Sequence, residues 1–132
     1  MITLARTYRF AAAHTLRSPH LSGAENARVY GKCAHPAGHG HDYHLEFQLR
    51  APRLTDDVVV GHGWLDQLVA RVIAPRFDRR DLNQTFGEDF ITTGENLAVA
   101  AHRLLAPHLP DGVALTVRLV ETEKNSFAFH GQ

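Results

Sequence analysis

The stretch that organises the chain is KCAHPAGHGHDY, residues 32–43. It contains the only cysteine, Cys33, and three of the ten histidines. One glycine separates His39 from His41, and both lead directly into a segment with alternating apolar side chains. Because side chains two residues apart in a strand point to the same face, these two imidazoles can be directed at one point. They form an incomplete site, since a catalytic zinc ion takes three protein ligands and keeps one position open.

The phase of two strands supplies a third histidine. In residues 2–14 the apolar side chains occupy even positions, and His14 ends that face. In residues 43–50 they occupy odd positions, and His39 and His41 precede them in the same phase. If the strands pair antiparallel, the end of the first lies beside the start of the second. A single histidine would more simply be a hydrogen-bonded core residue, but phase and location agree for all three, so we predict a zinc site.

The composition narrows the class of protein. A chain of 132 residues can bury a real core as one domain, and no linker or repeat divides it. Lys and Arg (14) balance Asp and Glu (14), which argues against nonspecific nucleic-acid binding. No apolar run reaches membrane-spanning length, the start lacks a signal-peptide pattern, and a lone cysteine suits a reducing compartment. We therefore expect a cytoplasmic protein with a small-molecule partner and no membrane or nucleic-acid partner.

The remaining patterns predict one α+β domain over residues 1–132. Residues 15–38 show no sustained period and are expected to be a long ordered loop or a pair of short turns. Apolar spacing predicts a helix over 64–73, and a second helix is expected to follow a capping box at 92–95. The segment between them is polar and irregular. Strands at 113–119 and 127–129 complete the order β-β-α-α-β-β.

Cys33 and Glu121 leave alternatives open. Cys33 is a fourth metal ligand, a nucleophile or base beside the metal, or a small buried residue, and ligand and base are equally compatible with the sequence. Glu121 continues the apolar phase of the third strand, where a carboxylate is costly to bury without a partner. A ligand with two adjacent N–H donors would satisfy it. The simpler interpretation is a solvated side chain or an ion pair with Arg118 or Lys124.

Motifs spread over nearly the whole chain resemble the 6-pyruvoyltetrahydropterin synthase and 6-carboxytetrahydropterin synthase family. They are FAAAH (10–14), SPHLS (18–22), EN (25–26), YGKC (30–33), GHGHDY (38–43), TTGEN (92–96) and ET (121–122). The block in which five residues separate Cys33 from His39 is the most specific of them.

The resemblance implies a T-fold (tunnelling fold), with a four-stranded antiparallel sheet and two helices on one face. Three subunits would close a twelve-stranded barrel, which would also remove the exposed edges of a lone sheet. Two trimers would stack into a homohexamer, with active sites between subunits.

The resemblance also implies a zinc-dependent lyase acting on 7,8-dihydroneopterin triphosphate. The implied Zn2+ ligands are His14, His39 and His41. Glu121 would hold the N–H edge of the pterin, Thr92 and Thr93 would lie at the start of the pterin-pocket helix, and Cys33 would be the base. Loss of triphosphate with internal redox gives 6-pyruvoyltetrahydropterin, on the route to tetrahydrobiopterin. Loss of the side chain as acetaldehyde gives 6-carboxytetrahydropterin, the queuosine precursor.

One position departs from the family pattern. The family's cysteine works with an Asp-His pair, but residues 77–83 here read FDRRDLN, so Asp78 matches the aspartate and Arg79 replaces the histidine. Arginine cannot shuttle protons at neutral pH. Arg79 would act through its charge, or His62 or His35 would substitute for the missing histidine. Our hypothesis is a reduced or redirected lyase activity.

Two other classes of function are compatible with these residues. One is a pterin- or purine-binding protein without catalysis, and the other is a structural zinc domain with Cys33 as the fourth ligand. Candidates for the triphosphate are Arg17, Lys32 and Arg118.

Overall fold

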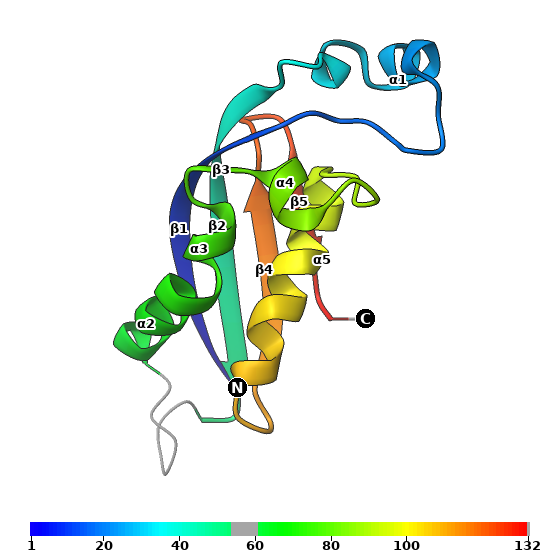
Figure 1. Cartoon of the computed structure of the whole chain (residues 1–132). Helices are drawn as coiled ribbons and strands as arrows, with labels where there is room; N and C mark the ends of the chain where they lie inside the picture. Colours follow the sequence, from blue (N-terminus) through cyan, green and yellow to red (C-terminus); the bar gives the residue numbers. More distant parts are fainter. Residues whose placement is uncertain (54–60, 132) are drawn as a thin grey trace.

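The computed structural model describes residues 1–53 and 61–131 (Figure 1). The elements in chain order are β1 (Ile2–His14), α1 (Gly23–Tyr30), the 3-10 helix η1 (Gly31–Ala34), β2 (His39–Ala51), α2 (His62–Val72), α3 (Ala74–Phe77), β3 (Arg80–Asp81), α4 (Leu82–Phe86), α5 (Gly94–Leu105), the 3-10 helix η2 (Ala106–His108), β4 (Ala114–Val120) and β5 (Ser126–Phe129). None of the helices in the described residues has the length and apolar character needed to span a membrane.

One sheet runs through the molecule in the order β3-β1-β2-β4-β5. β1 and β2 pair antiparallel over their whole length, from Ile2 opposite Ala51 to His14 opposite His39. The end of β1 and the start of β2 therefore lie together, as expected for an antiparallel pair. β4 and β5 continue the antiparallel pairing. The expected four-stranded sheet gains a fifth strand, because β3 pairs parallel with β1 at Ala12 and Ala13. β3 has two residues, too few to show an alternating pattern in sequence.

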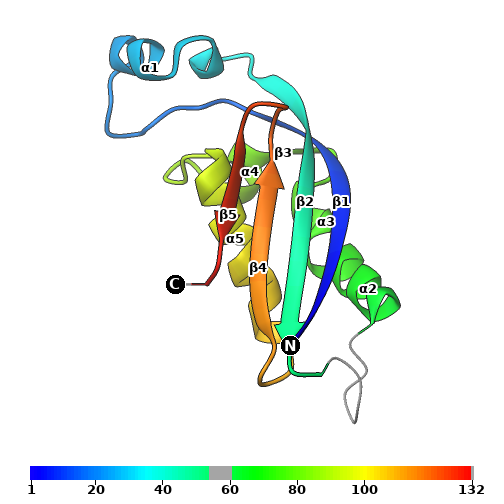
Figure 2. The same ribbon diagram turned by 180° about the vertical axis from the view of Figure 1, so that it is seen from behind.

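The long helices α2 and α5 cover one face of the sheet, with α3 and α4 beside them, and no helix of the described residues covers the opposite face (Figures 1 and 2). The core lies between these layers, where alternate residues of β2 such as Leu45, Phe47 and Leu49 are fully buried. Each such side chain stabilises the fold by about 1.5–3 kcal/mol relative to leaving it in water. Asp66 of α2 accepts hydrogen bonds from Arg6 of β1, which ties the helix layer to the sheet.

The segment before β2, expected to be a long ordered loop or a pair of short turns, contains helical structure. It forms an arm that extends beyond the end of the sheet and carries α1 (Figure 1). Ser22 and Glu25 make a capping box at the start of α1. The only buried residue of this helix is Asn26, whose amide bonds to the backbone of Ser18, so α1 has no apolar period that could have predicted it.

The start of α5 also differs from the prediction. The expected capping box at 92–95 is wrong, because the N-cap is Thr93, whose hydroxyl accepts from the Asn96 N–H. Thr92 therefore lies outside the helix with its side chain turned inward. Gly94, the first helical residue, leaves room for Phe127 of β5, whose ring a Cβ would overlap. This contact packs α5 closely against β5.

Candidate metal centre and substrate site

Three histidines converge at one end of the sheet. His14 is the last residue of β1, and the first residue of β2, His39, is its cross-strand partner. His41 follows on the same face, and the ring centroids are 4.6 to 5.0 Å apart. One ligand nitrogen from each residue lies within 4.8 Å of the others. The antiparallel register and the two-residue spacing in β2 are therefore sufficient to bring the three imidazoles together.

The donor set fits zinc. Burial lowers the pKa of His14 to about 4 and also lowers the pKa values of His39 and His41, so the rings are in the neutral form that binds a metal. Nε2 of His14 and Nε2 of His39 are 3.1 Å apart, close to the ~3.3 Å expected between two nitrogens on one tetrahedral zinc. Nε2 of His41 is buried and has no hydrogen-bond partner within the described residues. A shared cation would satisfy that nitrogen.

Glu121 lies beside the histidines. It directly follows β4, and its Oε1 atom is 3.5 Å from Nε2 of His41, with 13% of the side chain exposed. Burial raises the pKa of this carboxyl group. Glu121 therefore lies against the neutral His41 ring, and among the described residues it forms no ion pair with Arg118 or Lys124. The carboxylate is next to the three-histidine group.

Cys33 lies in η1 and is partly exposed. Its carbonyl accepts the Leu16 N–H at 2.7 Å, which fixes the backbone of η1 to the chain leaving β1. Burial raises the pKa of Tyr43, and the acidic groups of Glu121 and Cys33 raise it further. Cys33 and Glu121 thus both lie close enough to the Tyr43 hydroxyl to act on it electrostatically.

Asp78 and Arg79 lie along the outer edge of β1. Asp78 accepts the Ala11 N–H at 3.3 Å, and the Arg79 N–H donates to the Ala11 carbonyl at 2.6 Å. Arg79 has a φ of 56°, a left-handed conformation that is unfavourable for arginine, and its side chain is exposed. Within residues 1–53 and 61–131, no hydrogen bond or ion pair joins either side chain to Cys33.

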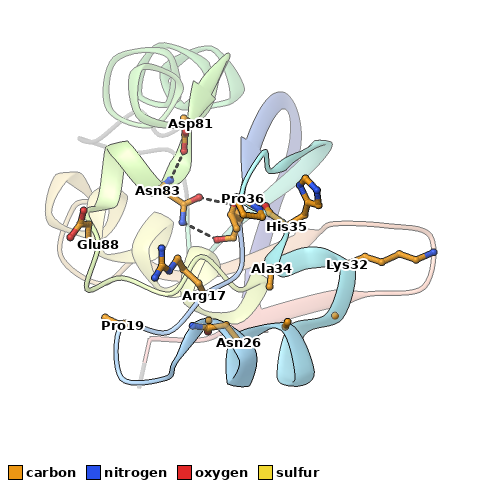
Figure 3. Close-up of a pocket in the computed structure, with 14 residues that line it drawn as sticks. Arg17, Pro19, Asn26, Lys32, Ala34, His35, Pro36, Asp81, Asn83 and Glu88 are labelled. Carbon is orange, nitrogen blue, oxygen red and sulfur yellow. Dashed lines mark hydrogen bonds between the residues drawn. The ribbon is translucent and has the colours of Figure 1, made fainter.

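A pocket of about 910 Å³ opens between the arm and α4 (Figure 3). Two of the triphosphate candidates, Arg17 and Lys32, line it together with the acidic residues Asp81 and Glu88. Figure 3 shows the Lys32 side chain extending away from Arg17. The third candidate, Arg118, is an exposed residue of β4 and is not among the lining residues.

The sequence did not single out two residues next to the histidines. The hydroxyl of Tyr43, which is fully buried, is 3.2 Å from Nε2 of His14. The sequence pattern could have identified Tyr43, since it continues the two-residue alternation of His39 and His41 in β2. The side chain of Asn83 bonds both the N–H and the carbonyl of Thr15, at 2.7 and 2.9 Å. No sequence pattern indicates that contact, because the two residues are 68 positions apart.

These features define a class of protein, a small α+β domain with a three-histidine centre at one end of its sheet. The model of the 6-pyruvoyl tetrahydropterin synthase family matches residues 3–132. The chain is 34% identical over 132 residues to the 6-pyruvoyl tetrahydrobiopterin synthase of Poecilia reticulata, covering 98% of this chain and 90% of the relative. It is 36% identical over 133 residues to that of Drosophila melanogaster, covering 97% and 79% respectively.

A solved structure of this family is similar to the chain over almost its whole length. The Caenorhabditis elegans 6-pyruvoyl tetrahydropterin synthase superposes with a TM-score of 0.88 at 32% identity, covering 99% of this chain and 96% of that one. The chain therefore belongs to the 6-pyruvoyl tetrahydropterin synthase family. Its fold is the T-fold of that family, with the short β3 added to the four antiparallel strands.

Proposed function

We propose that the protein is a zinc-dependent pterin lyase that acts on 7,8-dihydroneopterin triphosphate. The observation that carries this proposal is the convergence of three neutral histidines with one half-buried carboxylate, in a chain of the synthase family. His14, His39 and His41 would hold the ion. When bound, zinc would act as a Lewis acid on the side-chain hydroxyls of the substrate and make the adjacent C–H more acidic.

Glu121 would orient the substrate. A carboxylate can accept two parallel N–H donors, which an aminopyrimidinone edge presents side by side. Partial burial of Glu121 strengthens such bonds, because the local dielectric constant is lower than in water. Thr93 remains a candidate for the wall of the pterin pocket, whereas the expected role of Thr92 there is not favoured, because its side chain is fully buried. Arg17 and Lys32 remain candidates for the triphosphate. This arrangement would place the substrate side chain towards the histidines.

Cys33 would act as the base, with its thiolate taking a proton from the side-chain carbon of the substrate. Its partial exposure leaves the sulfur reachable, and a fourth-ligand role is less favoured because Cys33 is absent from the metal-ligating group formed by the described residues. Asp78 and Arg79 would complete the relay. Arg79 cannot exchange protons, so it would act through its charge and leave proton transfer to water or another group.

The presence of Arg79 where the family pattern has histidine favours a second candidate function, a pterin-binding protein with weak, redirected or no catalysis. Substitution of Arg79 by histidine separates the two. If the relay limits turnover, Arg79→His will raise the rate on dihydroneopterin triphosphate, whereas Arg79→Gln, which removes the charge without adding a proton carrier, will not. Unchanged turnover in Arg79→His would contradict a limiting relay.

The same protein would form trimers that close a barrel, and trimers would pair into a homohexamer. In the described part of the chain, β5 has one sheet neighbour, and the outer side of β1 has a strand partner only at Ala12 and Ala13, with Asp78 and Arg79 bonded to Ala11. Long unpaired edges invite pairing with another copy of the chain. Pairing between subunits would also place Asp78 and Arg79, on the edge of β1, near a neighbouring subunit.

Product analysis tests the proposed function. Zinc-loaded protein is incubated with dihydroneopterin triphosphate, and the products are identified by mass spectrometry. A 6-pyruvoyl or 6-carboxy tetrahydropterin supports a lyase, and release of acetaldehyde identifies the second. Tight calorimetric binding with no product after long incubation would instead support the binding protein.

A further inference from the structure

Thr92 and Tyr43 both contact Nδ1 of His14, and the Tyr43 hydroxyl is 3.3 Å from Nδ1 and 3.2 Å from Nε2. Nδ1 of His14 is 2.9 Å from the backbone carbonyl of Thr92 and 3.2 Å from the Thr92 hydroxyl. Both side chains are buried, with 2% of His14 and 0% of Thr92 exposed. Thr92 therefore contacts His14 on the Nδ1 side of the ring, whereas His39 lies 3.1 Å from Nε2.

The chemistry of these atoms determines the tautomer. A carbonyl oxygen can only accept, so Nδ1 of His14 must carry the proton, and the lone pair is left on Nε2. The Thr92 hydroxyl is oriented consistently, since it is 3.4 Å from the Thr15 carbonyl, to which it donates, and can accept from Nδ1–H. The available lone pair of His14 is thus on the nitrogen that lies 3.1 Å from Nε2 of His39.

Thr92 is itself fixed from two sides. The next residue, Thr93, caps α5, and its N–H donates to the Ile91 carbonyl at 2.9 Å. On the other side, the Thr15 carbonyl that accepts from Thr92 also accepts from the Asn83 amide. The end of β1, the start of α4 and the start of α5 therefore meet around His14.

We infer that Thr92 is a positioning residue that holds His14 as the Nδ1–H tautomer with Nε2 directed at the metal. The inference rests on the proposed function, because it concerns the same metal site. It gives the Thr92 side chain a role behind the ligand rather than against the pterin, as its complete burial requires. Groups that hold a metal-binding histidine in this way typically change metal affinity by about 10–100-fold when they are lost.

The test compares three threonine variants by zinc competition against a chromophoric chelator. Thr92→Val keeps the side-chain shape and removes the hydroxyl, so zinc affinity should fall about tenfold, the lower end of that range, because the backbone carbonyl remains. Thr92→Ser should restore most of the affinity. The matched control is Thr116→Val, which removes another buried threonine hydroxyl, 3.1 Å from Nδ1 of His130, and should leave zinc affinity unchanged. Equal affinity in Thr92→Val and wild type would overturn the inference.

A second measurement does not require a variant or the metal. Long-range 1H–15N NMR of the metal-free wild-type protein should show His14 protonated on Nδ1. An Nε2–H tautomer in a protein that still binds zinc would overturn the role of Thr92 and leave the proposed function intact. Wild-type protein that binds no zinc would contradict the proposed function, and the inference with it.

Discussion

His14 makes the stability of the metal-free protein depend on pH. Its pKa is about 4 in the folded protein, because burial disfavours the charged ring, against about 6.5 in an unfolded chain. Between these values the unfolded chain binds a proton that the folded protein does not, so the free energy of unfolding falls as the pH falls from 6.5 to 4. His39 and His41 are shifted in the same direction.

We expect urea titrations between pH 6.5 and pH 4 to show this fall in the free energy of unfolding. His14 should contribute at most about 1.4 kcal/mol per pH unit. His14→Gln should make the free energy of unfolding less dependent on pH. His108→Gln, which removes an exposed histidine, should leave the pH dependence unchanged. A wild-type profile with no slope below pH 6.5 would contradict a buried, neutral His14.

Glu121 is expected to contribute to pterin binding but not to zinc binding. In Glu121→Gln one carboxylate oxygen is replaced by an NH2 group, which would face the pterin N–H groups donor to donor. A hydrogen bond to a charged group contributes ~1.5–3 kcal/mol, so the affinity for dihydroneopterin should fall at least about tenfold. Calorimetry measures this, with zinc content checked in the same samples. Glu123→Gln, two residues along and exposed, is the matched control. Equal pterin affinity in Glu121→Gln and wild type would show that Glu121 does not bind the pterin.

At the scale of the elements, the N-cap of α5 supports both the helix and the site. Thr93→Ala removes the acceptor for the Asn96 N–H and should lower the free energy of unfolding by about 1 kcal/mol, whereas Thr93→Ser should retain most of it. Urea unfolding of the three proteins gives this comparison. If alanine and serine at position 93 were equally stable, the hydroxyl would not be the cap.

Elements with a strong period could be predicted from sequence, and elements held by tertiary contacts could not. The alternation in β1 and β2 predicted both strands and the side chains that share one face, because one face of each strand is buried. By contrast, α1 buries only Asn26, and β3 is held by pairing with Ala12 and Ala13, so neither has an apolar period. The local signal for α1 is its capping box, Ser22 and Glu25. The cap of α5 was misplaced by one residue because two adjacent threonines offer the same chemistry.

The same distinction applies to the site. His14, His39 and His41 could be brought together from strand phase, because pairing carries that information. The placement of Thr92 behind His14 depends on where the loop before α5 crosses β1, 78 residues away, which no local pattern specifies. In our proposal the relation of Cys33 to Asp78 and Arg79 depends on neighbouring subunits, so the pattern of a single chain would not specify it.

At the scale of the whole molecule, the open edges of β1 and β5 lead us to expect a closed oligomer. Light scattering after size-exclusion chromatography should give six times the monomer mass, with a trimer on dilution. Edge strands pair through their backbone N–H and C=O groups, and proline has no N–H. Ala128→Pro, at an exposed position of β5, should therefore weaken assembly, whereas Ala128→Ser should not. A monomer at every concentration would contradict the barrel and an active site shared between subunits.

We propose that the three histidines make this chain a zinc-dependent lyase. The most direct test follows consumption of dihydroneopterin triphosphate by wild-type protein before chelation, after chelation, and after zinc is restored, with His39→Ala beside it. We expect turnover that disappears on chelation, returns with zinc, and is absent in His39→Ala. Turnover that survives complete removal of the metal, or no turnover by fully zinc-loaded wild-type protein, would contradict the claim.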